Sequence, residues 1–240
     1  MNPAIGVLLE KYSALMDDVA TQSNVVYTGS PEIPCRNKCF DCCKQLFPIT
    51  FAEAFFLSEG VKTLSRETRR ERMRIAEKAT KKILAVEPLK FEKRGVERTA
   101  ALNTHAEFAR VLHTIDSNCP ALDPTNPAGS CTVYQWRNVD CRTMGASFDS
   151  TSKEIIGCFR FAGLKHLIPK MMNFSYRYKE KMELDRSLIE AITGGVITER
   201  VIYLTTMCRP LMLDYTSVDW LIFFKEKQLS AEGYSVVVDI

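Results

Sequence analysis

Apolar residues recur at three- and four-residue steps through the first part of the chain. This spacing places them on one face of an amphipathic helix, which we expect over residues 3–21. Its apolar members are Ile5, Leu8, Leu9, Tyr12, Leu15, Met16 and Val19. Residues 25–27 are expected to form a short strand or an extended lead-in. The glycine and prolines that follow, between residues 29 and 34, then predict a break in regular structure.

Two capping patterns predict further helices. Thr50 and Glu53 form a capping box, so a helix is expected from Phe51 to about residue 58, ending near Gly60. Ser65 is expected to cap a longer helix over residues 66–85. The charged residues of this longer helix are Arg66, Arg69, Arg70, Arg72 and Arg74, with Glu67, Glu71 and Glu77 between them. Mixed signs at helical spacing predict a solvated face rather than a nucleic-acid surface.

The second half of the chain alternates irregular and periodic segments. Residues 88–103 read as a polar connector with strand character near 98–102, and a capping box at 104–107 opens a helix to about residue 115. Residues 119–150 are rich in proline and turn residues, which predicts loops. A helix over 178–192 should stop at Gly194 and Gly195. Residues 201–205 and 217–227 should add to the core, and residues 234–240 should form a strand.

These elements predict one mainly helical α+β domain over residues 1–240. Residues 35–160 would form an irregular, loop-rich core with cysteine-ligated metal. The helix over 3–21 and a helical and strand part over 165–240 would complete the domain. A net charge of +3 gives no case for a nucleic-acid or membrane surface. The first 20 residues do not read as a signal peptide, and no apolar run approaches the ~20 residues of a membrane span. We therefore expect a cytoplasmic protein.

The nine cysteines are the most unusual feature of the composition. Eight fall into two groups: Cys35, Cys39, Cys42 and Cys43, and then Cys119, Cys131, Cys141 and Cys158. A reducing compartment and an odd number of cysteines argue against a disulfide framework, which is the alternative. We expect the two groups to close on each other around metal, and Cys208 to be a buried structural thiol.

Thiolates are soft ligands that select zinc or iron–sulfur clusters. Eight thiolates exceed the four that one zinc or one [4Fe–4S] cluster uses, so two zincs, or a cluster with a second site, fit the number. Cys42 and Cys43 are adjacent, and their side chains are expected to diverge. The spacing of Cys35, Cys39 and Cys42 matches the cluster motif of radical S-adenosylmethionine enzymes. However, Asp41 replaces the usual aromatic residue, and no partial-barrel series follows.

Several motifs that contain these cysteines resemble those of one protein family. The motifs are Cys39-x2-Cys42-Cys43, Ile49-Thr-Phe-Ala-Glu53-Ala, Cys119-Pro120-x-Leu122, Cys131-x-Val-Tyr134-x2-Arg137-x3-Cys141-Arg142, and Cys158. Together they resemble the YkgJ-type cysteine-cluster family, described as having a zinc- or iron-chelating domain and similar to the flagellin lysine N-methylases. The resemblance covers about residues 35–160. Two departures are the three residues between Cys35 and Cys39, and Asn138 where the family commonly has proline.

The resemblance implies a metal-binding domain holding an iron–sulfur cluster or zinc. For its methylase branch it also implies methyl transfer from S-adenosylmethionine to a protein lysine. Tyr134, Arg137 and Arg142 are the candidate cofactor-binding residues, because an arginine beside thiolates can offset charge or hold a carboxylate or phosphate. The alternative is an arginine that braces the loop through backbone carbonyls. A third hypothesis is a redox or metal-handling protein with a protein partner; no nucleic-acid or membrane partner is expected.

Overall fold

The computed structural model of the chain describes residues 3–35, 39–86, 105–123, 125, 130–197, 200–226 and 234–240. Its α-helices are α1 Pro3–Gly29, α2 Phe51–Lys62, α3 Arg66–Leu84, α4 His105–His113, α5 Val139–Thr143, α6 Phe174–Ile192, α7 Cys208–Met212 and α8 Trp220–Lys225. Short 3-10 helices are η1 Asp41–Lys44, η2 Tyr134–Trp136, η3 Phe159–Phe161, η4 Lys165–Lys170 and η5 Tyr215–Ser217. The strands are β1 Pro48–Thr50, β2 Leu122–Asp123, β3 Ser130–Cys131, β4 Ser147–Asp149, β5 Glu154–Ile156, β6 Met172–Asn173, β7 Arg200–Thr206 and β8 Tyr234–Val238.

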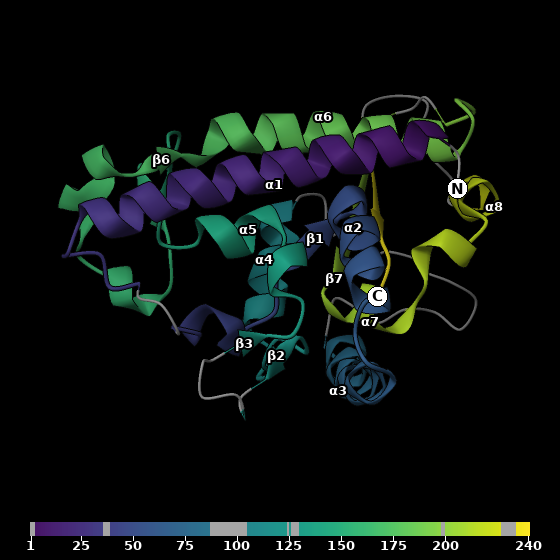
Figure 1. Cartoon of the computed structure of the whole chain (residues 1–240), viewed down its shortest axis with the longest axis horizontal. Helices are drawn as coiled ribbons and strands as arrows, with labels where there is room; N and C mark the ends of the chain where they lie inside the picture. The colour runs from purple at the N-terminus through teal and green to yellow at the C-terminus, as the bar shows by residue number, and fades with distance from the viewer. Residues whose placement is uncertain are drawn as a thin grey trace.

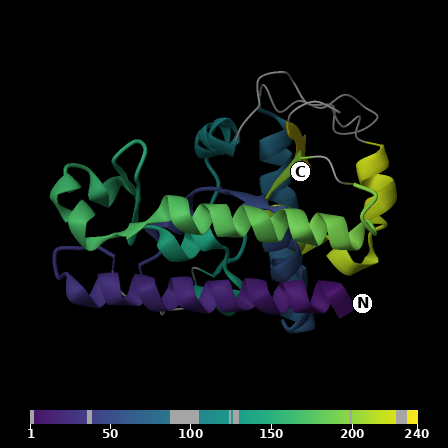
Figure 2. The same cartoon turned by 90° about the horizontal axis from the view of Figure 1, so that it is seen from above.

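Two long helices form one side of the molecule. Helices α1 and α6 lie side by side along its longest axis (Figure 1; Figure 2). The buried residues of α1 include Ile5, Tyr12 and Val19, which belong to the expected apolar stripe. The helix continues to Gly29, so the strand or extended lead-in expected at 25–27 is wrong. Val26 is buried on the same helical face and extends the stripe by two turns.

Helix α2 is the centre of the main core. Ten of its twelve residues are buried, and it packs against α1, α6 and α7. The expected capping box is present at its start, where the backbone N–H of Thr50 donates to Glu53 Oε2 at 2.9 Å. The helix ends at Lys62, two residues beyond the expected Gly60. A helix buried on all sides lacks a polar face, which explains why its apolar pattern is continuous.

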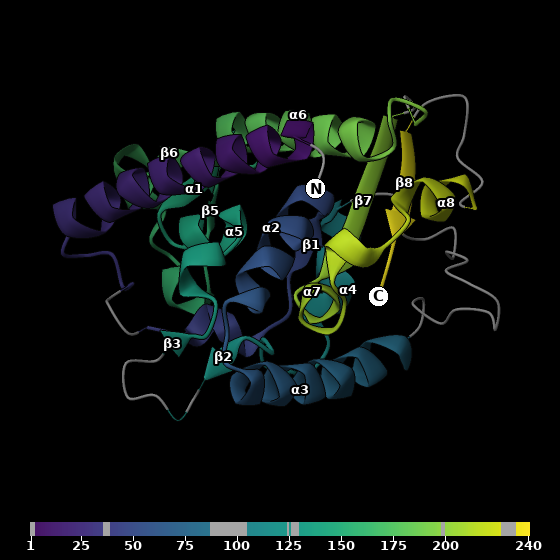
Figure 3. The same ribbon diagram turned by 45° about the vertical axis from the view of Figure 1, so that its right-hand side comes forward.

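Helix α3 lies at the edge of the molecule opposite α1 and α6, and it packs against α7 (Figure 3). Ser65 caps it as expected, since Ser65 Oγ accepts from the N–H of Thr68 at 3.1 Å. The prediction that all its arginines are solvated is wrong for Arg72. That side chain is buried and donates to the backbone oxygen of Leu122.

Short sheets join distant parts of the chain. In one sheet β7 lies between β1, to which it is antiparallel, and β8, to which it is parallel. In another, β4 lies between antiparallel β5 and parallel β6, and β2 pairs with β3. The expected C-terminal strand is thus present as β8. The described fold is mainly helical α+β, as predicted from the sequence.

The C-terminal segments complete the main core with an aromatic cluster. Phe51 at the start of α2 meets the rings of Tyr203, Trp220 and Phe224 edge-on, at centroid distances of 5.2, 4.8 and 5.8 Å. Helix α6 stops as predicted, with Gly194 and Gly195 at positive φ. A smaller second cluster, around Val26, Ile33, Phe161 and Leu167, lies apart from the main core.

Other expectations are met or lie outside the described residues. Among the described residues between 119 and 150, the regular elements are at most five residues long, as the turn-rich sequence predicts. The connector 88–103 and Thr104 of the second capping box lie outside the described residues. Across the described segments, no helix is both long and apolar enough to cross a bilayer.

Candidate metal centre

The eight candidate cysteines come from short or irregular segments around the core. In the first group, Cys35 and Cys39 lie on either side of residues 36–38, which are outside the described part, and Cys42 and Cys43 lie in η1. In the second group, Cys119 precedes β2, Cys131 ends β3, Cys141 lies in α5, and Cys158 follows β5. Cys119 is buried and the other seven are partly buried. All nine cysteines of the chain are free thiols in the structure, so none forms a disulfide.

Backbone hydrogen bonds bring the first cysteine group to the second. The N–H of Cys119 donates to the carbonyl oxygen of Cys43 at 2.7 Å, which joins segments 76 residues apart. The pairing of β2 with β3 then places Cys131 opposite Leu122. These contacts bring η1 and the 119–131 segment together at Cys43 and Cys119.

A second contact brings Cys35 to the end of α5. Cys35 Sγ lies 3.8 Å from the carbonyl oxygen of Met144, as donor to acceptor. The next residue, Gly145, has φ of +77°, and a Cβ at this position would lie 2.6 Å from Cys35 Sγ. Glycine is therefore required here by both the backbone conformation and the close approach of the thiol.

The electrostatic neighbours of each thiol divide the cysteines into two neighbourhoods. Burial, with the nearby Cys39 and Cys158 thiols, raises the pKa of Cys35 to about 12. Arg160 opposes this rise. The first neighbourhood thus combines residues from before η1 with one residue from beyond β5.

The second neighbourhood contains Cys119, Cys131 and Cys141. Burial raises the pKa of Cys119 well above its usual range, and the thiols of Cys131 and Cys141 add to the rise. Burial likewise raises the pKa of Cys141, with Cys42 as the next contributor. A hydrogen bond with Cys43, together with burial, raises the pKa of Cys42 far above its usual range, so the expectation that these adjacent side chains diverge is wrong. Cys42 also contributes to the raised pKa of Cys35, so it lies between the two neighbourhoods.

The donor chemistry fits a thiolate-bound metal, but the side chains do not form a closed coordination shell. Within the described segments, no three Cys, His, Asp or Glu side chains are placed to hold one metal ion. The thiols are neighbours whose side chains would have to turn toward a common point to bind. A thiol with a raised pKa stays protonated at neutral pH, so metal binding would release its proton.

Asp41 ties the first cysteine group to the segment after Cys158. Its carboxylate accepts from Lys44 at 2.7 Å and pairs with Arg160 at 2.5 Å, and its side chain is only 8% exposed. The hydrogen bond from Lys44 is the main cause that lowers the pKa of Asp41. Cys39 Sγ lies 3.9 Å from the same carboxylate. No local sequence pattern indicates the Asp41–Arg160 pair, because 118 residues separate its two members.

The three candidate cofactor residues have different surroundings. Arg142 is buried and donates to the backbone oxygens of Arg137 and Gln135, at 3.2 and 2.6 Å. These are the hydrogen bonds of a loop-bracing arginine, the alternative that the sequence left open. Arg137 also braces the loop, because its Nε donates to the backbone oxygen of Tyr134 at 3.1 Å. Its guanidinium stacks on the Tyr134 ring, 3.6 Å from the centroid, and Tyr134 is 56% exposed. Tyr134 thus faces the solvent, whereas Arg137 is partly buried and opposes the rise in the pKa of Cys42 and Cys141.

A buried carboxylate positions the helix that carries Cys141. Glu53 Oε1 accepts from the backbone N–H of Val139 at 3.1 Å, while its other oxygen caps α2. One side chain therefore caps the first turns of both α2 and α5. The sequence identified Glu53 as a capping residue but missed its contact with Val139, 86 positions later.

Lys181 of α6 neutralises this carboxylate inside the protein. Its Nζ lies 3.3 Å from Glu53 Oε1 and 3.9 Å from Asp140 Oδ2, and the Lys181 side chain is fully buried. The two carboxylates raise the pKa of Lys181 despite the opposing effect of burial. Asp140 precedes Cys141, so an ion pair to α6 holds the turn next to a candidate ligand. A helical pattern alone cannot reveal this role.

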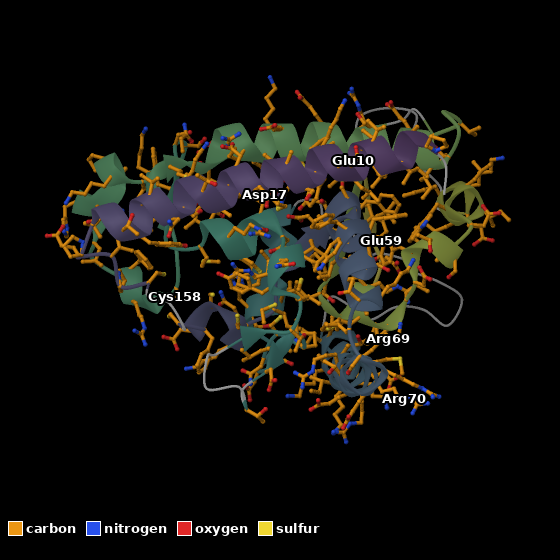
Figure 4. All side chains as sticks on the ribbon, viewed as in Figure 1. Glu10, Asp17, Glu59, Arg69, Arg70 and Cys158 are labelled. Atoms are coloured by element: carbon orange, nitrogen blue, oxygen red, sulfur yellow. The ribbon has the colours of Figure 1, made fainter. Side chains whose placement is uncertain are left out.

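A surface cavity of about 260 Å³ adjoins Cys158. Its lining is Glu154, Ile155, Gly157, Cys158, Phe161, Ala162, Gly163 and Lys165. The ion pair between Lys165 and Glu154, 2.5 Å long, supplies both charges of the lining, and Phe161 supplies an apolar wall. Figure 4 labels Cys158 at the end of the molecule distant from α3. Solvent-borne molecules can therefore reach this part of the first neighbourhood.

No family model, curated protein or solved structure matches this chain. The resemblance to the YkgJ-type family therefore stays a prediction that rests on the sequence motifs alone.

Proposed function

We propose that this chain is a metal-binding protein that holds an iron–sulfur cluster or zinc through its cysteines. The observation that supports the proposal best is the hydrogen bond between Cys119 and Cys43, at 2.7 Å. It joins the two cysteine groups although 75 residues intervene. Reduced, partly buried thiols drawn from several segments are the ligand set that zinc and iron–sulfur clusters use.

The two neighbourhoods favour two centres over one. Cys35, Cys39 and Cys158 would supply the first centre, and Cys119, Cys131 and Cys141 the second. Cys42 and Cys43, whose thiols are hydrogen-bonded to each other, would supply the remaining ligands where the two centres meet. Ligation would tie together segments that have little regular structure of their own, and the binding free energy would then stabilise the domain.

Metal analysis with a visible absorption spectrum, on anaerobically purified protein, tests the proposal directly. Iron with acid-labile sulfide and a brown colour identifies a cluster. Stoichiometric zinc without colour identifies a structural or transferable zinc site. Protein that contains neither metal, and whose thiols all titrate freely, contradicts the proposal.

Cysteine variants separate ligands from ordinary buried thiols. Cys39→Ser and Cys141→Ser should each lower metal content and solubility, because each removes a ligand from a different group. Cys208→Ser is the matched control: Cys208 is a buried free thiol outside the two cysteine groups of the sequence, with a pKa raised to about 11 mainly by burial, and it makes only the smallest contribution to the raised pKa of Cys119. Full metal occupancy in Cys39→Ser and Cys141→Ser would contradict closure of the two groups.

The cavity beside Cys158 favours one second candidate, a methyltransferase that uses S-adenosylmethionine beside an iron–sulfur centre. A metal ligand that borders a solvent-accessible cavity gives a small molecule access to the centre. Titration calorimetry with S-adenosylmethionine tests it: binding should require the metal-loaded protein and be lost in Cys158→Ala. Absence of binding to fully loaded wild-type protein would leave the metal-binding proposal intact and reject this activity. A metal carrier, in contrast, would yield its metal to a chelator without unfolding.

A further inference from the structure

Helix α3 carries a regular row of exposed cations. Arg66, Arg70, Arg74, Lys78 and Lys82 follow one another at four-residue steps, and all five are exposed. We refer to them as the basic strip. Residues four apart lie about 6 Å apart along a helix axis and on nearly the same face, so the strip follows the length of α3. The helix as a whole has eight basic and three acidic residues, whereas the entire chain has a net charge of +3.

The basic strip is not neutralised by the protein itself. Across the described segments, Arg66, Arg70, Arg74 and Lys78 form no ion pair. Glu71 of the same helix pairs with buried Arg72, at 2.8 Å, instead of with a member of the strip. Lys82 donates to the backbone oxygen of Asp116 and has no carboxylate partner within those segments. The acidic residues of α3 thus do not neutralise the basic strip in the structure.

This arrangement does not serve the stability of α3. Like charges at i and i+4 destabilise a helix, and the strip contains four such pairs in succession. The buried side of the helix, formed by Arg72, Ala76, Ala79 and Ile83, is fixed by packing and does not depend on the strip. A repeated unpaired charge on the solvent side is therefore explained by a partner that supplies the opposite charge.

We propose that the basic strip docks an acidic helical segment of a partner protein. Such a segment would present carboxylates at four-residue steps, matching the spacing of the strip. Glu67 and Glu77 on the same helix would pair with basic residues of a protein, whereas a nucleic-acid backbone offers only negative charge. Helix α3 also contains no aromatic residue on which a base could stack. Both features favour a protein partner over a nucleic acid.

The position of α3 places the docked partner beside the cysteine loops. Buried Arg72 reaches across to the backbone oxygen of Leu122, which lies opposite Cys131 in the β2–β3 pair. The labelled acidic residues Glu10 and Asp17 of α1 lie on the opposite edge of the molecule from Arg69 and Arg70 (Figure 4). An acidic partner would therefore be repelled from α1 and steered to α3. This inference does not depend on whether metal is bound.

The test compares two variants of the full chain with the same change in charge. The strip variant replaces four cations of the basic strip with glutamine: Arg66→Gln, Arg70→Gln, Arg74→Gln and Lys78→Gln. The control variant replaces four exposed cations elsewhere: Lys11→Gln, Lys179→Gln, Arg186→Gln and Lys225→Gln. Glutamine keeps helix propensity, and removal of like-charge pairs should leave α3 at least as stable. Thermal unfolding of both variants establishes that they fold.

The probe is a synthetic helical peptide of about 20 residues with glutamate at every fourth position and lysines between. Its binding is measured by fluorescence anisotropy at low and at physiological salt. We expect the wild type and the control variant to bind alike, and the folded strip variant to bind at least roughly tenfold more weakly. Higher salt should weaken wild-type binding, because the pairs are exposed.

Three results would overturn the inference. The first is an equal loss of binding in the strip and control variants, which would make the attraction a matter of net charge. The second is tighter binding, dependent on the strip, to a single-stranded RNA of similar length. The third is strip-dependent dimerisation of the wild type alone in sedimentation at low salt, which would assign α3 to a second copy of this chain.

Discussion

At the scale of single residues, buried charges explain how the cysteine-bearing turn is fixed. Glu53 accepts hydrogen bonds from the first turns of two helices, and Lys181 balances it and Asp140. Removing one partner of a buried ion pair is costly because the other charge stays in an apolar environment without compensation. Single substitutions of these residues should therefore lower the free energy of unfolding by a measurable amount.

Lys181→Met should destabilise the protein by about 3–5 kcal/mol, because it leaves Glu53 and Asp140 buried without their cation. The free energy of unfolding from urea titration measures this loss. Lys179→Met is the matched control: Lys179 is an exposed residue of the same helix, and surface substitutions usually change stability by less than about 0.5 kcal/mol. Similar small losses in both variants would contradict the role assigned to Lys181.

Asp185 predicts a pH dependence of stability. Burial raises the pKa of this carboxyl from 3.8 to about 7, against the lowering effect of its hydrogen bond from the N–H of Ala52 at 2.6 Å. The folded chain therefore holds a proton that the unfolded chain releases near pH 4. The stability that this proton contributes is complete below pH 3.8 and is lost as the pH rises through about 7.

Asp185→Asn should remove this part of the pH dependence, because asparagine still accepts from Ala52 but does not ionise. Between pH 5 and 8, the free energy of unfolding of the wild type should fall relative to that of the variant. Urea titrations of both proteins at several pH values give the difference. A constant difference across that range would show that Asp185 has the same protonation state throughout.

At the scale of elements, close packing of α2 against η2 positions the exposed Tyr134–Arg137 stack. Gly60 of α2 faces Trp136, and a Cβ at this position would lie 2.2 Å from Trp136 Cγ. Trp136 in turn lies 4.7 Å from Phe56, between ring centroids. Glycine inside a helix is intrinsically unfavourable, so its presence here is explained by the approach of Trp136.

Gly60→Ala should therefore lower the free energy of unfolding by about 1–3 kcal/mol, the usual cost of overpacking. Gly6→Ala in α1 is the contrasting substitution, because a Cβ at position 6 would have no neighbouring atom within 4 Å. Alanine at position 6 should stabilise the protein by about 0.5–1 kcal/mol. Chemical denaturation of both variants tests the pair, and equal effects of the two alanines would rule out steric contact as the cause.

The sequence predicted helices well where capping and periodicity agree. Ser65 and Thr50 mark the starts of α3 and α2, and Gly194 follows the end of α6, because these signals act within a few residues. Sequence-based prediction failed where contacts between residues far apart in the chain determine the structure. Arg72 lies among charged neighbours in the sequence, yet its buried partner, the Leu122 carbonyl, is 50 residues away. Val25 to Tyr27 favour a strand locally, but Val26 continues the buried face of α1.

At the scale of the whole molecule, the candidate site also combines features that the sequence predicts with features that only tertiary contacts determine. Cysteine spacing predicted that the two groups approach each other. The hydrogen bond from the backbone N–H of Cys119 to the carbonyl oxygen of Cys43 agrees with this. Spacing could not predict that Cys158 shares a neighbourhood with Cys35, or that Glu53 holds the Cys141 helix. These relations depend on how α1, α5 and α6 pack, and that packing is not encoded by any local pattern.

If the proposed metal is bound, the packing also predicts that its removal affects the surroundings of the two tryptophans differently. The chain has two tryptophans: Trp136 in η2, between Cys131 and Cys141 in the sequence, and Trp220 in the C-terminal aromatic cluster. Trp220 is buried and donates to the Tyr215 carbonyl at 2.7 Å, within contacts that need no cysteine. If metal orders the cysteine loops, its removal should loosen the surroundings of Trp136 first, because regions of a protein open with different free energies.

Single-tryptophan variants make this measurable. In Trp220→Phe, which keeps only Trp136, chelation of the metal should shift the fluorescence emission to longer wavelength. In Trp136→Phe, which keeps only Trp220, the emission should change little at the same chelator concentration, and full unfolding in urea supplies the reference for complete exposure. Equal and simultaneous shifts in both variants would mean that the metal stabilises the aromatic core as much as the cysteine loops. The domain would then unfold as one cooperative unit when its metal is removed.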